Sequence, residues 1–374
     1  MREKMRWERS LLWLAAAVLA VVLGIGATLA LGSRVEASDA DVKREAEEKM
    51  ALCMEAIRGY KEEEGLELAE EDLFETGLLG DRLTGLTTTL GILEAKRTSA
   101  ATVMAALAVE LLTEAGVKAG DTIGAGFSGS FPGLNLALLC ACDAMGVRCI
   151  YIASIGASSY GANQPELTFP EMACRLAEDG LISDYPAAVS AGGEMDVGTD
   201  MDQNDLASVW EQLSQWEVLR IEIEDYPENL SYRQGIYGAD GPLSCFVGVG
   251  GGLVTAGRGE TDLGQGVIAP DRVGPITEKS GLLERYSASG IPVIQLLNIK
   301  KLVADYGLPY DPEEPAEIGA SALYYEMNYP AGPALLGIGA ALFCLAGYRR
   351  QKRRERRAIC EEDSEMAVEM VSED

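Results

Sequence analysis

Two serine hydroxyls in a short glycine turn have the most suggestive spacing for chemistry in this sequence. Ser128 and Ser130 flank Gly129 in GFSGSFPG, between an apolar run that predicts a strand and one that predicts a helix. Two hydroxyls and the free backbone N–H groups of a helix N-terminus suit a carboxylate or a phosphate. The alternative is that glycine and serine serve only the tight geometry of a strand-to-helix turn.

Catalysis by these hydroxyls needs a base other than histidine, because the 374-residue chain contains none. This absence excludes Ser-His-Asp and Cys-His catalysis and zinc sites built on imidazole. Lys96 is the nearest reasonable base in sequence for Ser128, Ser130 or a threonine of the run 87–89. The catalytic candidates are Ser128, Ser130 and Lys96, although binding without catalysis is the first interpretation.

Further ligand-binding candidates lie in two other loops and in the threonine run. The loop after residue 154, SIGASSYGANQ, and the run GVGGG each follow an expected strand, where functional residues often gather. GVGGG lacks the Lys-Ser/Thr of a phosphate-binding loop and the spacing of a dinucleotide fingerprint, so no nucleotide or other cofactor is assigned. The candidates are Ser158, Ser159, Asn163, Gly250, Gly251, Gly252 and Thr88.

Acidic residues and cysteines do not predict a metal site. The patch Glu194, Asp196, Asp200, Asp202 and Asp205 has calcium-ligand chemistry without the spacing of an EF-hand, so a solvated acidic loop is expected. The cysteines between the apolar ends, six of the eight in the chain, are read as small buried residues, with disulfides in an oxidising compartment as the alternative.

The elements that must position these residues predict an α/β fold. Residues 122–127 and 148–154 read as strands on either side of a helix at 133–145, and a looser copy follows GPLSCFVGVGGG. Two such halves predict a doubly wound, Rossmann-like, mostly parallel sheet, with ligands at the carboxyl ends of its strands. Residues 177–243 read as acidic and loop-rich.

Two helices are expected before this sheet. SDADVKREAEEKMALCMEAIRGYKEEE predicts an amphipathic helix over 39–64. AATVMAALAVELLTEAG predicts a second helix, capped by Thr98 or Ser99 and ending at Gly116.

Apolar runs at both ends predict transmembrane helices. Residues 11–32 carry no charge, and 330–348 lead into the basic block YRRQKRRERR. Basic residues lie between each apolar run and the nearer chain terminus, which places both termini in the cytoplasm. The chain is therefore expected to be a two-pass cell-membrane protein with an extracytoplasmic domain. A cleavable signal peptide and a buried core helix are the respective alternatives. The expected segments are a basic N-terminus (1–10), a span (11–32), an amphipathic helix with its connector (33–82), the α/β domain (83–329), a second span (330–348) and a cytoplasmic tail (349–374).

The extracytoplasmic part is strongly acidic. Residues 33–330 contain 20 basic and 49 acidic residues, a formal charge of −29. Such a field repels nucleic acid, which is excluded as a partner, and it makes a divalent cation a plausible one.

Several of these stretches together resemble the family of poly-γ-glutamate system proteins of bacteria. The matching features are the N-terminal span, GLTTTLGILEAKRTSA, GFSGSFPGLNLALLCACDAMG, IASIGASSYGANQPELTFPEM and GVGGG, and the similarity covers residues 83–309. The resemblance implies a role in synthesis, export or processing of a surface or capsule polymer of γ-linked glutamate. The implied partners are the membrane components of the polymer synthase and exporter, and the anionic polymer or glutamate itself.

The leading expectation is a non-enzymatic accessory protein that binds a glutamate-type carboxylate at residues 128–130 and 158–163. The alternatives are a histidine-independent amide hydrolase or transferase acting on the polymer, and an extracytoplasmic ligand sensor. Because a domain of charge −29 repels a polyanion, binding needs a local basic pocket, bridging cations or a helix N-terminus.

Overall fold

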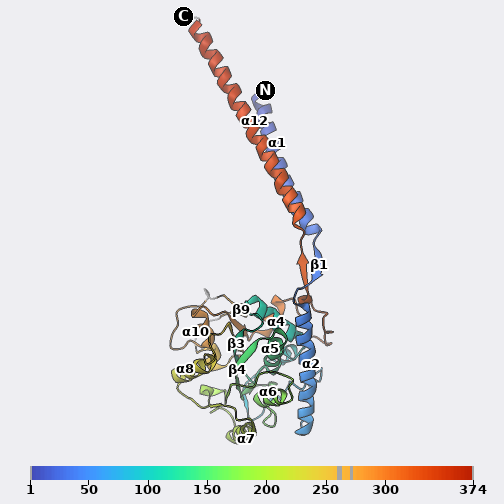
Figure 1. Cartoon of the computed structure of the whole chain (residues 1–374), viewed down its shortest axis with the longest axis vertical. Coiled ribbons are helices and arrows are strands. Elements are labelled where there is room, and N and C mark those ends of the chain that lie inside the picture. Colours follow the sequence, from blue (N-terminus) through green and yellow to red (C-terminus); the bar gives the residue numbers. More distant parts are fainter. Residues whose placement is uncertain (1, 259–262, 270–272, 373–374) are drawn as a thin grey trace. The chain divides into compact units, whose positions relative to one another are not determined.

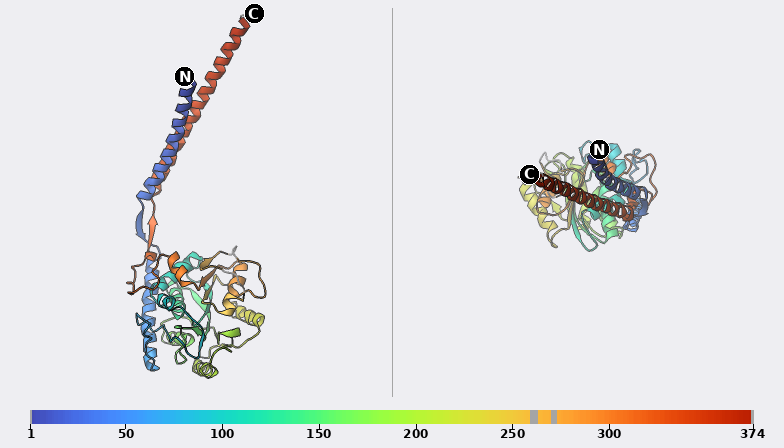
Figure 2. Two further views of the ribbon diagram at one scale, coloured as in Figure 1. Left: turned by 180° about the vertical axis from the view of Figure 1, so that it is seen from behind. Right: turned by 90° about the horizontal axis from the view of Figure 1, so that it is seen from above.

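The computed structural model describes residues 2–258, 263–269 and 273–372, which form two compact units. One unit combines the two ends of the chain, Met1–Glu36 and Tyr325–Asp374, and the other is Ala37–Tyr324. Figure 1 labels some of their elements, and Figure 2 gives two further views.

The unit Ala37–Tyr324 is built on a seven-stranded sheet in the order β7-β6-β4-β3-β8-β10-β9. β9 pairs antiparallel with β10, and the other pairings are parallel. The predicted α/β class with a mostly parallel sheet is therefore confirmed. The strands are β3 (Thr122–Phe127), β4 (Arg148–Ser154), β6 (Ala188–Ser190), β7 (Arg220–Ile221), β8 (Cys245–Val249), β9 (Gly266–Ile268) and β10 (Val293–Leu296).

Helices pack on both faces of this sheet (Figure 1). On one face are α2 (Ala40–Glu63), α3 (Leu93–Ser99), α4 (Val103–Glu114), α5 (Pro132–Met145), α6 (Phe169–Glu178) and α11 (Ile299–Asp305). On the other are α8 (Tyr226–Tyr237), α9 (Leu253–Ala256) and α10 (Leu282–Ala288). At the edge where the sheet ends in β6 and β7, α7 (Gln203–Leu213) packs in a third cluster.

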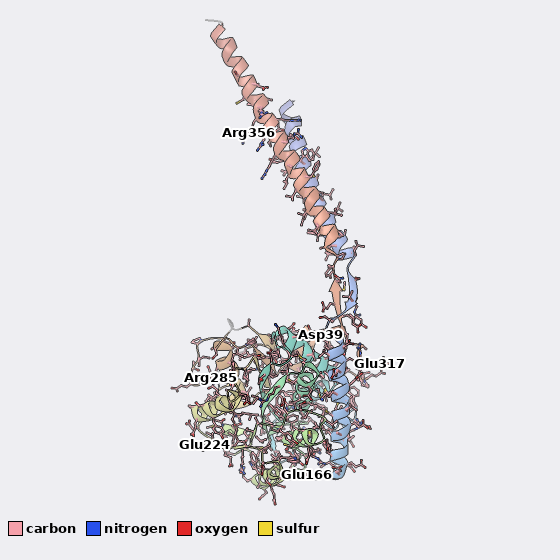
Figure 3. The ribbon with its side chains drawn as sticks, viewed as in Figure 1. Asp39, Glu166, Glu224, Arg285, Glu317 and Arg356 are labelled. Atoms are coloured by element: carbon pink, nitrogen blue, oxygen red, sulfur yellow. The ribbon has the colours of Figure 1, made fainter. Side chains whose placement is uncertain are left out.

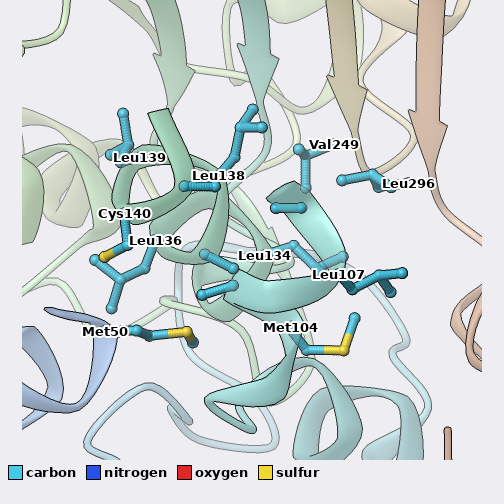
Figure 4. Packing of buried hydrophobic residues seen from close by; sticks show 14 of the residues in the cluster. Met50, Met104, Leu107, Leu134, Leu136, Leu138, Leu139, Cys140, Val249 and Leu296 are labelled. Atoms are coloured by element: carbon cyan, nitrogen blue, oxygen red, sulfur yellow. The ribbon is translucent and has the colours of Figure 1, made fainter. Parts of the chain in front are cut away.

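The apolar strands are explained by burial on both faces. On one face of the sheet, Ile123 and Ala125 of β3 belong to the cluster under α4 and α5. On the other face, Phe246 of the neighbouring strand β8 belongs to the cluster under α8 and α10. Figure 4 shows Met50 of α2 and Leu136 of α5 close to one another in the first cluster. A strand covered on both faces reads as a nearly continuous apolar run, which made β3, β4 and β8 recognisable from sequence.

Short elements complete the unit. β2 (Thr87–Thr89) pairs in parallel with β5 (Ala157–Ser158), and the 3-10 helices are η1 (Glu194–Asp196), η2 (Ser214–Trp216) and η4 (Ala322–Tyr324). Exposed carboxylates such as Glu166, Glu224 and Glu317 lie on the outside of the unit (Figure 3), as its acidic composition requires.

The unit formed by the chain ends consists of α1 (Arg2–Ala30), α12 (Ala331–Ser372) and the antiparallel pair β1 (Ser33–Glu36) and β11 (Tyr325–Asn328). Both helices are long and apolar enough to cross a membrane, over Leu11–Ala30 and within Ala331–Glu361. They approach closely at Gly24 and Gly337, because a Cβ at Gly24 would lie 2.9 Å from the Cα of Gly337. The first residues of α1 and the last residues of α12 point to the same end of the helix pair (Figure 1).

Two sequence predictions were wrong. Thr98 and Ser99 do not cap the helix that follows; they belong to the last turn of α3, and α4 begins only at Val103. Residues 177–243 are not mainly loop, because they contain β6, β7, α7 and α8. The strands were missed because each has only two or three residues, too few for a period-2 pattern.

Candidate functional site

The carboxyl ends of four neighbouring parallel strands, β6, β4, β3 and β8, surround a cavity of about 320 Å³. After β3, the strands β4, β6 and β7 are added in one direction along the sheet. The chain then returns to place β8 and β10 on the opposite side of β3, so the strand order reverses between β3 and β8. The cavity is lined by Thr88, Thr89, Ser128, Ser130, Ser154, Gly156, Gly192, Gly193, Glu194, Asp196, Asp200, Gly251, Gly252, Leu253 and Gly257.

Two glycine loops form one wall by close backbone approach. A Cβ at Gly129 would lie 2.8 Å from the carbonyl oxygen of Ile155, so only glycine fits in the turn after β3. Gly250 after β8 has φ +79°, and a Cβ there would lie 2.8 Å from the Cβ of Ser128. The Ser128 N–H donates to the Val249 carbonyl at 3.2 Å, which ties the two loops together.

Hydroxyl groups from several elements give the cavity lining its polar character. Ser128 and Ser130 precede the N-terminus of α5, Ser154 ends β4, and Thr88 and Thr89 come from β2. Hydroxyls beside a helix N-terminus present donors and a partial positive charge, which favour a carboxylate or phosphate group.

Lys96 lies behind the hydroxyl wall and is 1% exposed. Its Nζ donates to the Ser130 carbonyl and, at 2.7 Å, to Ser158 Oγ, and it lies 4.1 Å from the centroid of the Phe131 ring. Burial disfavours the charged ammonium and lowers the pKa of Lys96 to about 7. The lysine therefore loses much of its charge near neutral pH.

Ser158, rather than Ser128 or Ser130, is the hydroxyl that contacts Lys96. The Ser158 N–H also donates to Ser130 Oγ at 2.9 Å, so β5 is tied to the turn after β3 directly by this bond and indirectly through Lys96, which contacts both. Ser158 is 7% exposed and does not line the cavity. Lys96 and Ser158 are thus within the hydrogen-bond distance of a Ser-Lys catalytic pair. Both also contact Ser130, so their main role is to stabilise the turn after β3.

The wall that follows β6 is acidic. Glu194 and Asp200 are exposed carboxylates, and an Asp200 oxygen accepts the Glu194 N–H at 2.7 Å. Both line the cavity together with Asp196, which is buried. This wall favours a cationic group, such as an ammonium.

Asp196 is held by a buried network on its far side. Its carboxylate accepts from Ser190 Oγ at 2.9 Å, from Asn229 Nδ2 at 3.0 Å and from Arg233 NH2 at 2.5 Å. Arg233 is 4% exposed and donates further to Ser190 and Asn229. Since Arg233 compensates Asp196, Glu194 and Asp200 provide the net negative charge of the cavity.

The structure brings some of the sequence-predicted site residues together and leaves others apart. Those that line the cavity are Thr88, Ser128, Ser130, Gly251 and Gly252, and those that support its wall from behind are Lys96, Gly129, Ser158 and Gly250. Ser159 and Asn163 are buried elsewhere in the loop. Asn163 is fully buried and bonds the Asp81 backbone and Thr87 Oγ1, which fixes the loop conformation.

Several site residues were missed from the sequence. Arg233 carries no local signal, because it lies in an ordinary helix far along the chain from Asp196. Gly192 and Gly193, directly after the apolar stretch AVSA, were the available signal for a strand end at the cavity. The acidic patch was read as a solvated loop, and this is wrong for Asp196 and incomplete for Glu194 and Asp200, which line the cavity. Asp202 instead caps α7, accepting from two backbone N–H groups.

Within the described residues, no group of three or more His, Cys, Asp or Glu side chains is arranged to hold a metal ion. The cysteines of this unit are buried free thiols, in line with their interpretation as small apolar residues; they are Cys53, Cys140, Cys142, Cys149, Cys174 and Cys245.

No protein-family model, curated protein or solved structure with which the chain was compared matches it. The class of protein is therefore defined by the structure alone: an α/β unit with a polar cavity at its strand ends, in a chain whose two terminal helices are long and apolar enough to cross a membrane.

Proposed function

We propose that this chain is a membrane-anchored accessory protein of poly-γ-glutamate synthesis, export or processing. In this proposal the cavity of the α/β unit binds a glutamate-type group, the free amino end of the γ-linked chain. Its implied partners are the membrane components that make and export the polymer. The proposal combines the family resemblance of residues 83–309 with the chemistry of the cavity.

The observation that carries the proposal is the opposite character of the two cavity walls. Hydroxyls of Ser128 and Ser130 beside the N-terminus of α5 suit the α-carboxylate, whereas Glu194 and Asp200 suit an α-ammonium. An amino acid carries both groups on one carbon. In a γ-linked chain only the amino-terminal residue keeps a free ammonium beside its α-carboxylate.

The size and charge of the cavity also favour a chain end over an internal stretch. Its volume of about 320 Å³ lies at the lower end of the roughly 300–1,000 Å³ of small-molecule sites. A polyanion is repelled by the acidic residues of this unit, whereas the zwitterionic end of the chain carries the one positive charge that the acidic wall can attract.

The sheet and the terminal helices support the remaining parts of the proposal. The reversal of strand order between β3 and β8, with helices on both faces, is typical of a doubly wound sheet, whose ligands bind at this reversal. The apolar parts of α1 and α12 would anchor the chain as two spans. Their basic flanks would lie in the cytoplasm and the α/β unit outside it.

Calorimetric titration of the detergent-solubilised full chain tests this proposal. The probes are L-glutamate, the dipeptide γ-glutamyl-glutamate, glutarate, which lacks the ammonium, and 4-aminobutyrate, which lacks the α-carboxylate. We expect L-glutamate and γ-glutamyl-glutamate, which have both an α-ammonium and an α-carboxylate, to bind at least tenfold more tightly than the two truncated probes. Gly251→Leu should abolish binding, because Gly251 lines the cavity and a Cβ there would meet only Leu297 Cδ1, at 3.8 Å, so the added side chain occupies ligand space without straining the backbone.

Matched variants separate the two walls. Glu194→Gln should weaken L-glutamate about tenfold without weakening glutarate, because it removes one carboxylate from the acidic wall. Ser128→Ala should weaken glutarate as well. Gly235→Leu, on the exposed face of α8 with no atom nearby, is the control for added bulk. Binding that survives Gly251→Leu would place the ligand elsewhere and overturn the proposal.

A second candidate function rests on the 2.7 Å contact between Lys96 Nζ and Ser158 Oγ. A neutral lysine with a pKa of about 7 can take the proton of a serine hydroxyl, whose oxygen would then attack the carbonyl carbon of a γ-amide. The C–N bond would break, the leaving amine would take the proton from Lys96, and water would hydrolyse the resulting ester. Incubation of the full chain with poly-γ-glutamate tests this reaction. Shortened polymer that is lost in both Ser158→Ala and Lys96→Met would establish a hydrolase, and unchanged polymer length with the unmodified chain would exclude one.

A further inference from the structure

A second cavity lies between the two terminal helices and does not belong to the site described above. It has a volume of about 570 Å³, and residues of α1 and α12 line it together. They are Trp13, Phe343, Ala346, Gly347, Arg350, Gln351, Arg354 and Glu355.

The apolar part of this cavity is formed by two aromatic side chains. A Cβ at Gly347 would lie 2.9 Å from the Trp13 ring, so the glycine allows the half-buried indole to pack against the α12 backbone. Phe343, one helical turn before Gly347, is 73% exposed. The two rings provide a hydrocarbon-like surface next to a polar one.

The polar part is cationic. Arg350 and Arg354 are four residues apart on α12 and therefore share one face of the helix. Among the described residues neither arginine forms an ion pair. Glu355 also lines the cavity, but its carboxylate lies 3.2 Å from Lys352 Nζ and accepts from Gln351 Nε2 at 3.0 Å. The charge that remains to attract a ligand is therefore that of the two arginines.

We propose that this cavity binds the phosphate headgroup of an anionic phospholipid. The guanidinium groups of Arg350 and Arg354 would bind the phosphate oxygens, since their planar forks match phosphate geometry, and the acyl chains would lie against Trp13 and Phe343. The inference rests on the membrane anchoring proposed above, and not on the glutamate site. Free phosphate would use the arginines but leave the aromatic wall exposed, so a lipid fits the whole cavity better.

The position of the cavity supports this ligand. Leu11–Ala30 is apolar, and the basic block containing Arg356 (Figure 3) follows directly after the apolar part of α12. The cavity thus spans the change from apolar to basic sequence, which in a bilayer corresponds to the level of the headgroups. Anionic lipids concentrate beside basic segments on the cytoplasmic side.

Native mass spectrometry of the detergent-solubilised full chain, titrated with phosphatidylglycerol or phosphatidylcholine, tests the proposal. We expect at least one phosphatidylglycerol to remain bound under conditions that remove phosphatidylcholine. Arg350→Gln/Arg354→Gln should weaken phosphatidylglycerol binding on the order of tenfold or more, because it removes both cationic contacts. Inorganic phosphate at equal concentration should not compete.

The matched control is Arg349→Gln/Arg353→Gln, which removes two exposed arginines at the same spacing on the same helix but outside the cavity. It should retain at least half of the bound lipid. Equal losses in both double variants would show diffuse attraction by the basic block and overturn the site. Competition by inorganic phosphate would overturn the lipid as its ligand. Carbonate extraction of membranes reports the anchoring separately, so failure of the anchor and failure of the lipid site are distinguishable.

Discussion

Two buried basic side chains near the cavity at the strand ends have different kinds of hydrogen-bond partner. Arg233 is 4% exposed and faces the buried Asp196 carboxylate, with Ser190 and Asn229 completing its contacts. Lys96 is 1% exposed, and the acceptors that contact its Nζ are the neutral Ser130 carbonyl and Ser158 hydroxyl.

The difference teaches which charge is fixed and which can change. A guanidinium stays protonated at any physiological pH, so Arg233 needs a carboxylate and obtains one. An ammonium can lose its proton, and burial lowers the pKa of Lys96 to about 7 instead of requiring a counter-ion. The acidic wall therefore rests on a permanent ion pair, whereas the hydroxyl wall rests on a group that titrates near neutral pH.

The largest expected effect breaks the permanent pair. Asp196→Ala leaves Arg233 buried without its carboxylate, which should cost about 3–5 kcal/mol of unfolding free energy. Urea unfolding of the full chain in detergent, followed by tryptophan fluorescence, measures it.

The double variant Asp196→Ala/Arg233→Met provides the control. Removal of both charges leaves no unpaired ion, so at least half of the lost stability should return. A double variant as unstable as Asp196→Ala alone would mean that the loss comes from Ser190 and Asn229 rather than from the charge.

The second effect concerns the titrating lysine. The pKa of Lys96 is lowered from 10.5 to about 7 on folding, so above pH 7 the folded chain has lost a proton that the unfolded chain retains up to pH 10.5. This contribution makes folding more favourable as pH rises, by about 2–3 kcal/mol between pH 7 and pH 9. Between pH 7 and pH 9 the free energy of unfolding should therefore rise by about 2–3 kcal/mol more in the unmodified chain than in Lys96→Met.

The pH dependence of Lys96→Met must be subtracted from that of the unmodified chain, because other groups titrate in the same pH range. Burial also lowers the pKa of Lys61, to about 8, which adds a contribution of the same sign. Lys118→Met, at an exposed position, controls for loss of a lysine as such. Equal pH dependence in the unmodified chain and in Lys96→Met would show that Lys96 keeps its proton, and the contrast with Arg233 would disappear.

The sequence identified the half of the cavity that follows long apolar strands. β3 and β4 agree with the predicted residues 122–127 and 148–154, and the turn at Ser128 to Ser130 lines the cavity as the end of β3 requires. Lys96 was considered as a base because it was close in sequence, and it does lie beside the turn. Its actual hydroxyl partner, Ser158, lies 62 residues further along, and only the folded chain brings them together.

Apart from the glycine pair that follows β6, the acidic half could not be derived from sequence. β6 has three residues and β7 two, so neither shows alternation, and the surrounding acidic residues suggested solvent exposure. Asp196 is buried, and the residue that compensates its charge, Arg233, lies 37 residues away on α8. Pairing between distant residues leaves no local pattern in a single sequence.

A smaller effect sharpens the comparison on the lysine side. Ser158→Ala removes one hydrogen-bond partner of Lys96 and should cost about 1 kcal/mol at pH 7, where part of the lysine is charged. The cost should shrink at pH 9, because a neutral amine needs its acceptors less than an ammonium does. Unfolding at both pH values measures it, and a cost that grows with pH would contradict the deprotonation of Lys96.

The smallest effect is expected for an arginine–aspartate pair outside the core. Arg148 NH1 lies 2.8 Å from Asp240, but the two side chains are 55% and 51% exposed, against 5% and 8% for Arg233 and Asp196. Water already solvates these charges, so Asp240→Ala should cost less than about 1 kcal/mol, and less still at high salt. Measured beside Asp196→Ala by the same urea unfolding, this variant isolates burial as the variable, because the chemistry of the pair is unchanged. If Asp240→Ala lowered the free energy of unfolding about as much as Asp196→Ala, burial would not explain the large effect of removing Asp196.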